Sequence, residues 1–218
     1  MFFSDWFGPS ITRAAPGGAR IALTFDDGPS ESTPHVLDIL AHHGARATFF
    51  LVGMNTARLP EIARRVIKEG HEIGNHTYSH ANFYRRAPWQ VANEIELCQR
   101  TLEDTLGVAP RWFRPPFGCR WFGLFPTLER LKMRNAMWSV DTCDWRDPAA
   151  AIIERAERLT VDGDVVLMHD GFRTHPGDHR KETVKALPVL LARFRERGCS
   201  TPTLTEMFRR DGSLSAGR

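Results

Sequence analysis

The stretch Ile21-Ala-Leu-Thr-Phe-Asp-Asp-Gly-Pro-Ser30 is an apolar run that ends in two adjacent carboxylates and a Gly-Pro pair. Such a run predicts a buried strand, and Gly28 and Pro29 predict that it gives way to a loop. Two carboxylates at the mouth of a buried strand are unfavourable unless a metal ion or another cation lies beside them. The stretch therefore predicts a buried strand and a positively charged partner for Asp26 and Asp27.

Outward from this strand, apolar runs alternate about seven times with helical patterns, and the connections are short. The helical patterns begin near Thr33, Pro60, Pro88, Thr127, Pro148 and Glu182. Alternation of this kind predicts an α/β fold with a parallel sheet, which is either open and doubly wound or closed into a barrel. The predicted strands are Arg20–Phe25, Ala47–Val52, Glu72–Asn75, Arg111–Phe113, Ala136–Val140, Val165–Met168 and Ser200–Leu204.

Composition narrows the class of protein. The chain has 218 residues, 42% of them hydrophobic, which suits a single domain with a substantial core. Its net charge is +3, with 29 basic residues scattered among 26 acidic ones, so no nucleic-acid partner is predicted. A Gly-x-Gly-x-x-Gly motif and a Walker lysine are both absent, which gives nucleotide binding no support. The oligomeric state is left open, and a monomer is compatible with these features.

The sequence also contains features that predict where in the cell the protein resides. No stretch approaches the roughly 20 apolar residues of a membrane span, so none is predicted. The first ten residues lack a basic region and carry Asp5 within their apolar part, which makes a poor signal peptide. A cytoplasmic protein is therefore expected, with export by a leader absent from this chain as the alternative. The four cysteines contain no Cys-x-x-Cys pair, so free thiols are favoured over a zinc ribbon or a disulfide framework.

Chemically active side chains follow the predicted strands rather than precede them. In parallel barrels and α/β sheets the carboxyl ends of the strands meet at one face, where active sites are built. This distribution favours an enzyme over a passive scaffold. The residues concerned are Asp26 and Asp27 after the first strand, His76 and His80 after the third, Arg114 after the fourth, Asp141 and Asp144 after the fifth, and His169 after the sixth.

His76 and His80 are four residues apart, a spacing that directs two imidazoles to the same side of a helical turn. Two imidazoles and one carboxylate form a common open metal site, with positions left for water and substrate. A metal hydrolase also needs a group that takes a proton from water. The neighbours Asp26 and Asp27 can divide these two tasks, although Asp-Gly-Pro is also ordinary surface-turn chemistry.

Five stretches in this order resemble the motifs of the polysaccharide deacetylases, the NodB-homology domain of carbohydrate esterase family 4. They are Thr24-Phe-Asp-Asp-Gly-Pro29, His76-Thr-Tyr-Ser-His80, Arg114-Pro-Pro-Phe-Gly118, Asp141-Thr-Cys-Asp-Trp145 and Leu167-Met-His169. The resemblance runs from about Arg20 to Leu204, and it implies a distorted, TIM-barrel-like (β/α)7 barrel in a single domain. The expected organisation is an N-terminal extension over 1–19, the deacetylase domain over 20–205 and a C-terminal tail over 206–218.

The resemblance also implies roles for individual residues. Asp26 would be the general base, held ionised by Arg114, and His169 would be the general acid, oriented by Asp144. Asp27, His76 and His80 would bind a divalent metal ion, with Zn²⁺ expected first and Co²⁺ or another divalent ion as alternatives. Phe117, which stands where many relatives have Tyr, would contact substrate and supply a backbone N–H to the oxyanion. Trp145 and Leu167 would form the wall of the pocket for the acetyl methyl group.

The implied function is metal-dependent removal of N-acetyl or O-acetyl groups from an acetylated polysaccharide or oligosaccharide, such as chitooligosaccharide or peptidoglycan N-acetylglucosamine. Three alternatives remain: a glycosidase, a metal amidohydrolase of the same superfamily acting on a non-sugar amide, and a non-catalytic carbohydrate-binding relative. A glycosidase needs no His pair. In the loop after His169, contact with substrate or metal is less expected than exposure to solvent for His175, Asp178 and His179.

Overall fold

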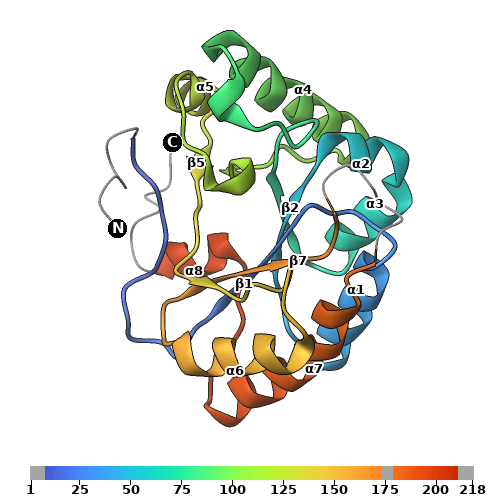
Figure 1. Ribbon diagram of the computed structural model, residues 1–218, viewed down its shortest axis with the longest axis vertical. Coiled ribbons are helices and arrows are strands. Elements are labelled where there is room, and N and C mark those ends of the chain that lie inside the picture. Colours follow the sequence, from blue (N-terminus) through green and yellow to red (C-terminus); the bar gives the residue numbers. More distant parts are fainter. Residues whose placement is uncertain (1–7, 173–178, 211–218) are drawn as a thin grey trace.

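The computed structural model describes residues 8–172 and 179–210 (Figure 1). Its centre is one sheet of seven parallel strands, in the order β5-β4-β3-β2-β1-β7-β6. The sheet curls into a half-barrel, which confirms the predicted (β/α)7 fold. The strands are β1 (Ala22–Asp26), β2 (Thr48–Leu51), β3 (Glu72–Asn75), β4 (Trp112–Phe113), β5 (Arg134–Asn135), β6 (Val140–Asp141) and β7 (Val165–His169).

Helices cover the convex side of this sheet. The main core lies between the strands and α1, α3, α4, α6 and α7, and Phe25 stacks on Phe49 there with ring centroids 5.1 Å apart. The helices are α1 (Thr33–His42), α2 (Gly53–Arg58), α3 (Pro60–Lys68), α4 (Pro88–Leu106), α5 (Leu124–Arg130), α6 (Ala149–Leu159), α7 (Lys181–Glu196) and α8 (Leu204–Arg210), with 3₁₀ turns η1 (Phe83–Arg85) and η2 (Pro116–Gly118).

The two-residue period of the strands sorts side chains between the two sides of the sheet. On β1, Leu23 and Phe25 belong to the helix-covered core, whereas Ala22 packs in a second cluster with Phe50 and Val165. This second cluster also contains Leu204, Met207 and Phe208 of α8, so α8 closes the concave side near the start of β1. Thr24 and Asp26 share a face with Ala22, which places Asp26 on the concave side at the open end.

The predicted strand Ala136–Val140 is wrong, because β5 has already ended at Asn135 and β6 begins only at Val140. β5 and β6 lie at opposite edges of the sheet, and residues 136–139 connect them. The carbonyl groups of Ala136 and Met137 accept hydrogen bonds from the guanidinium of Arg114, at 3.0 and 2.9 Å. These carbonyls therefore bind a side chain instead of a neighbouring strand.

The predicted strand Ser200–Leu204 is also wrong. Ser200 makes one isolated parallel bridge with Arg20, and the chain then enters α8. Thr203 and Glu206 form a capping box at the start of this helix. The side chain of each residue accepts a hydrogen bond from the backbone N–H of the other. The expected domain boundary at residue 205 thus falls inside a helix whose Met207 and Phe208 are buried.

The described part of the N-terminal extension lies along the barrel. Ile11 forms a parallel bridge with Ala136, and Arg13 forms an antiparallel bridge with Asp164.

Among residues 8–172 and 179–210, none of the helices has both the length and the apolar character that crossing a bilayer requires.

Candidate active site

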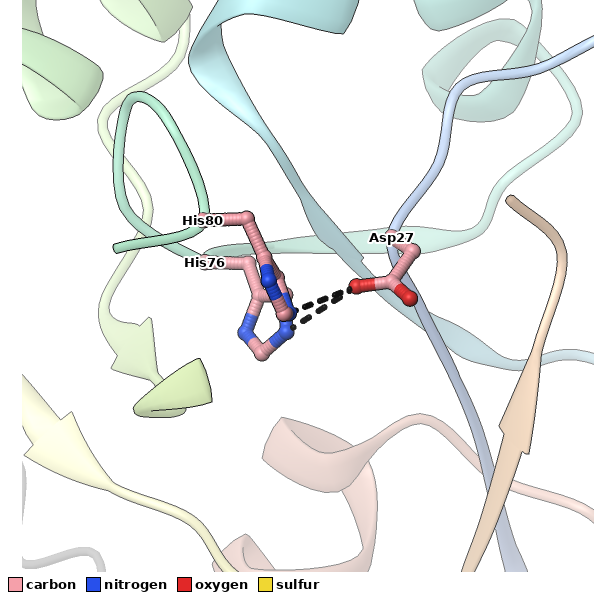
Figure 2. A group of neighbouring side chains, drawn as sticks. All are labelled: Asp27, His76 and His80. Carbon is pink, nitrogen blue, oxygen red and sulfur yellow. Dashed lines mark ion pairs between the residues drawn. The ribbon is translucent and has the colours of Figure 1, made fainter. Parts of the chain in front are cut away.

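The predicted metal ligands meet at the open end of the half-barrel (Figure 2). Asp27 follows β1, and His76 and His80 come from the loop after β3. In the sheet, β2 lies between β1 and β3. Asp27 Oδ1 lies 3.0 Å from His80 Nε2 and 3.5 Å from His76 Nε2. One ligand atom from each residue lies within 4.8 Å of the other two, which is the geometry of a possible three-ligand metal site.

The chemistry of these atoms fits a cation. His76 Nδ1 lies 2.7 Å from the carbonyl oxygen of Arg114, so Nδ1 is used as a hydrogen-bond donor there and Nε2 is the ring nitrogen that faces Asp27 and could bind a metal. Asp27 Oδ1 is buried and has no hydrogen-bond partner among the described residues. Burial raises the pKa of Asp27, but His76 and His80 outweigh it and hold that pKa well below its usual range. Burial lowers the pKa of His80, which favours its neutral, ligating form.

Asp26 is held by Arg114 from inside the barrel. Arg114 is fully buried, and its Nη1 donates to Asp26 Oδ1 at 2.7 Å and to Thr24 Oγ1 at 2.8 Å. Its guanidinium lies 4.1 Å from the ring centroid of Phe50, so an aromatic face supports the cation. Asp26 Oδ2 lies 3.7 Å from His76 Nε2, so the carboxylate also faces the possible metal site.

His169 and Asp144 form a second charged pair across the pocket. Parallel pairing of β1 and β7 sets Asp26 opposite His169 in register. His169 Nδ1 lies 2.7 Å from Asp144 Oδ1, while Asp144 Oδ2 accepts hydrogen bonds from the His169 backbone N–H and from Thr183 Oγ1, each at 2.7 Å. Burial lowers the pKa of His169, but Asp144, with Asp27 and Asp26, outweighs burial and raises this pKa to about 9.

One cavity of about 340 Å³ connects these groups. Phe117, Trp145 and Leu167, the predicted substrate contacts, all line it with the metal-site residues. The ring of Phe117 lies 4.8 Å from the ring of His80, and Trp145 is 52% exposed at the rim. Arg114 and Asp144 do not line the cavity, since they lie behind Asp26 and His169. All ten predicted site residues are thus together at one end of the barrel.

Backbone strain is concentrated around this cavity. Seven non-glycine residues in the described chain have a positive φ, and five of them lie in the strand-end loops that carry the site. Such a conformation costs on the order of 1–3 kcal/mol unless the surroundings enforce it, and it is common at functional sites. The five are Asp27, Thr77, His80, Phe117 and Cys143.

Sequence reasoning missed several residues here. Phe172 and Arg180 line the cavity, and the buried carboxyl of Asp170 accepts a hydrogen bond from Thr33 at 2.5 Å beneath the Asp27 turn. No spacing or motif indicated Arg180, but Asp170 adjoins His169 and could have been considered. Of the loop residues that had been considered, His179 is half-exposed near Glu31 and does not line the cavity. His175 and Asp178 lie outside the described residues.

A parallel half-barrel with a possible Asp-His-His metal site between a carboxylate and a histidine defines a metal-dependent hydrolase. Residues 13–142 match the family model described as polysaccharide deacetylase. The chain therefore belongs to the polysaccharide deacetylase family, as the five motifs indicated. The matched region ends before Asp144 and His169, so the roles of these two residues rest on the motifs and on the geometry described above.

The similarity to individual relatives extends over most of this chain. A peptidoglycan-N-acetylglucosamine deacetylase from Bacillus cereus is 38% identical over 192 residues, covering 87% of this chain and 68% of that protein. A chitooligosaccharide deacetylase from Bradyrhizobium is 35% identical over 202 residues, covering 88% and 91%. The crystal structure of the Bc1960 peptidoglycan N-acetylglucosamine deacetylase matches with a TM-score of 0.83 and 36% identity over 92% of each chain. This chain is accordingly a metal-dependent carbohydrate deacetylase.

A further structural neighbour is a family 4 carbohydrate esterase pseudoenzyme from Bacillus anthracis, with a TM-score of 0.83 and 28% identity over 91% of this chain and 68% of that chain. The fold alone therefore does not separate active members from inactive ones. In this chain the predicted base, acid and metal ligands all line one cavity.

Proposed function

We propose that the chain is a zinc-dependent deacetylase that hydrolyses the N-acetyl group of glucosamine units in a glycan such as chitooligosaccharide or peptidoglycan. The observation that carries this proposal is the pairing of Asp26 with Arg114 and of His169 with Asp144 on two sides of Asp27, His76 and His80. The names of the similar proteins support both glycans, which share the N-acetylglucosamine unit. Two imidazoles and one carboxylate suit Zn²⁺, and Co²⁺ also accepts this ligand set.

Asp27, His76 and His80 would hold the ion, which when bound supplies a polarised amide carbonyl and a more acidic water. Asp26 is placed to take the proton from the attacking water, because Arg114 fixes one of its oxygens and leaves the other facing the cavity. A new C–O bond forms at the acetyl carbon. The backbone N–H at Phe117 is the proposed donor to the oxyanion, and one such donor is typically worth about 3–4 kcal/mol.

His169 completes the reaction by giving a proton to the departing nitrogen as the C–N bond breaks. Its raised pKa, about 9, keeps the imidazole protonated at neutral pH. Asp144 holds Nδ1, so the other ring nitrogen is the one presented to substrate. The products are acetate and the free amino sugar, and the proton taken by Asp26 balances the one given by His169.

Acetate release from a panel of substrates tests this proposal. The panel contains N-acetylated chitooligosaccharides, peptidoglycan, acetylxylan and a non-sugar cyclic imide, each with metal-free, zinc-loaded or cobalt-loaded protein. Zinc-dependent release from the N-acetylated glycans is expected. Hydrolysis of the imide alone would favour the amidohydrolase alternative, and no release from any substrate by zinc-loaded protein would contradict the proposal.

A further inference from the structure

Arg180 contacts the possible metal site from outside its ligand set. It immediately precedes α7, and its side chain is only 10% exposed. Its Nη2 lies 3.7 Å from Asp27 Oδ2, and its Nε donates to the carbonyl of Gly171 at 2.5 Å. The backbone N–H of Arg180 donates to Ser32 Oγ at 2.8 Å, so main chain and side chain are both anchored.

The surroundings of Arg180 leave it little freedom. Its guanidinium lies 5.0 Å from the ring centroid of Phe172, which adds an aromatic contact to the hydrogen bonds. Gly171 packs directly on the Asp27 turn, since a Cβ at this position would lie 2.3 Å from the Asp27 carbonyl oxygen. The Gly171 carbonyl that holds Arg180 is therefore fixed relative to Asp27, and the distance between the two side chains is set by packed backbone.

The two carboxylate oxygens of Asp27 consequently face different partners. Oδ1 points to His76 and His80, and Oδ2 points to Arg180. Carboxylates and imidazoles that ligate a metal are usually oriented by hydrogen-bonding groups behind them, and loss of such a group typically costs 10–100-fold in metal affinity. An arginine suits this task because its fork binds two acceptors at once and stays charged at every physiological pH.

We propose that Arg180 is a positioning residue of the metal site, which holds Asp27 Oδ2 and so directs Oδ1 toward the ion. The inference rests on the proposed function, because Asp27 must be a metal ligand for it to apply. A positioning role and a simple charge effect predict opposite changes in metal affinity when Arg180 is replaced. A cation close to the site repels a divalent ion, so removing only a repulsive charge would strengthen metal binding, whereas removing the group that orients Asp27 would weaken it.

The test measures the zinc dissociation constant of metal-free protein by competition with a chromogenic chelator. We expect Arg180→Met to weaken zinc binding about 10-fold or more. Arg180→Lys keeps the charge but cannot bind Gly171 and Asp27 together, so it should also weaken binding. The matched control is Arg197→Met at the other end of α7, because Arg197 likewise donates to a carbonyl (Thr160, 2.7 Å) and lies 5.9 Å from a Phe ring centroid (Phe194). This control should bind zinc like the wild type.

Each other outcome is informative. Equal or tighter zinc binding by Arg180→Met would overturn the inference, and so would an increased KM with an unchanged zinc constant, which would assign Arg180 to substrate. Thermal unfolding of the metal-free variants checks their folding, and Arg180→Lys alone decides the question if the Met variant does not fold. Absence of zinc binding in the wild type would instead contradict the proposed metal, which separates the two failures.

Discussion

At the residue scale, Asp26 and Asp27 are neighbours with different surroundings. Asp26 is the last residue of β1, and strand alternation places its carboxylate on the concave side against Arg114. Asp27 has left the strand with φ 74°, which turns its side chain toward the two histidines. A single change of backbone conformation therefore separates a candidate base from a candidate ligand.

Exchange of each carboxylate for an amide tests this separation. Asp26→Asn should lower the rate of acetate release by about 10²–10⁴-fold, the usual contribution of a general base, while zinc affinity changes little. Asp27→Asn should lose zinc affinity, because an amide oxygen is a poorer ligand than a carboxylate. Chelator competition and acetate release on both variants check these results. Loss of zinc by Asp26→Asn alone would show that the two assignments are reversed.

The rate of acetate release should depend on pH through His169, whose pKa is raised mainly by Asp144. A general acid acts only while protonated, so the rate should persist below the His169 pKa of about 9 and fall above it. Asp144→Asn removes the main group that raises this pKa, so the alkaline limb of the kcat profile should move to lower pH. Thr183→Val removes one hydrogen bond to Asp144 and keeps its charge, so a smaller shift is expected. An unmoved limb in Asp144→Asn would exclude His169 as the group observed.

At the element scale, the sequence predicted most of the sheet and the face that carries the site. Helical and apolar runs are local patterns, and residues after parallel strands necessarily gather at one end, so the ten candidate residues lie together while their roles stay predictions. The division of 136–140 was not predictable, because it depends on Arg114 reaching carbonyls from another part of the chain. Arg180 was missed for the same reason, since only the return of α7 to the turn after β1 brings it to Asp27.

The helix α8 provides a test at this scale. The expected boundary at residue 205 treats 206–218 as a tail, yet Met207 is fully buried beneath the barrel. Met207→Ala should therefore lower the free energy of unfolding by about 2–5 kcal/mol, measured by urea denaturation. The exposed Arg209 is the matched control, and Arg209→Ala should change stability by less than about 0.5 kcal/mol. Equal, small effects of both changes would mean that α8 is dispensable for the fold.

At the scale of the whole molecule, the possible metal site joins parts of the sheet that the chain builds separately. Asp27 belongs to the turn after β1, and His76 and His80 belong to the loop after β3. These three ligand atoms are close together only when β1, β2 and β3 are paired, since β2 lies between the other two. An ion that binds all three therefore binds the folded chain in preference to the unfolded one, and it should stabilise the fold.

The expected stabilisation follows from mass action. Zinc at 100 times its dissociation constant should raise the free energy of unfolding by about 2.7 kcal/mol. For a chain of this size this corresponds to a rise in the melting temperature of about 5–10 °C, measured by calorimetry with and without zinc. His80→Ala removes one ligand and should show a much smaller rise at the same zinc concentration. An equal rise in this variant would place the zinc elsewhere, whereas no rise in the wild type would show that the three residues do not hold it.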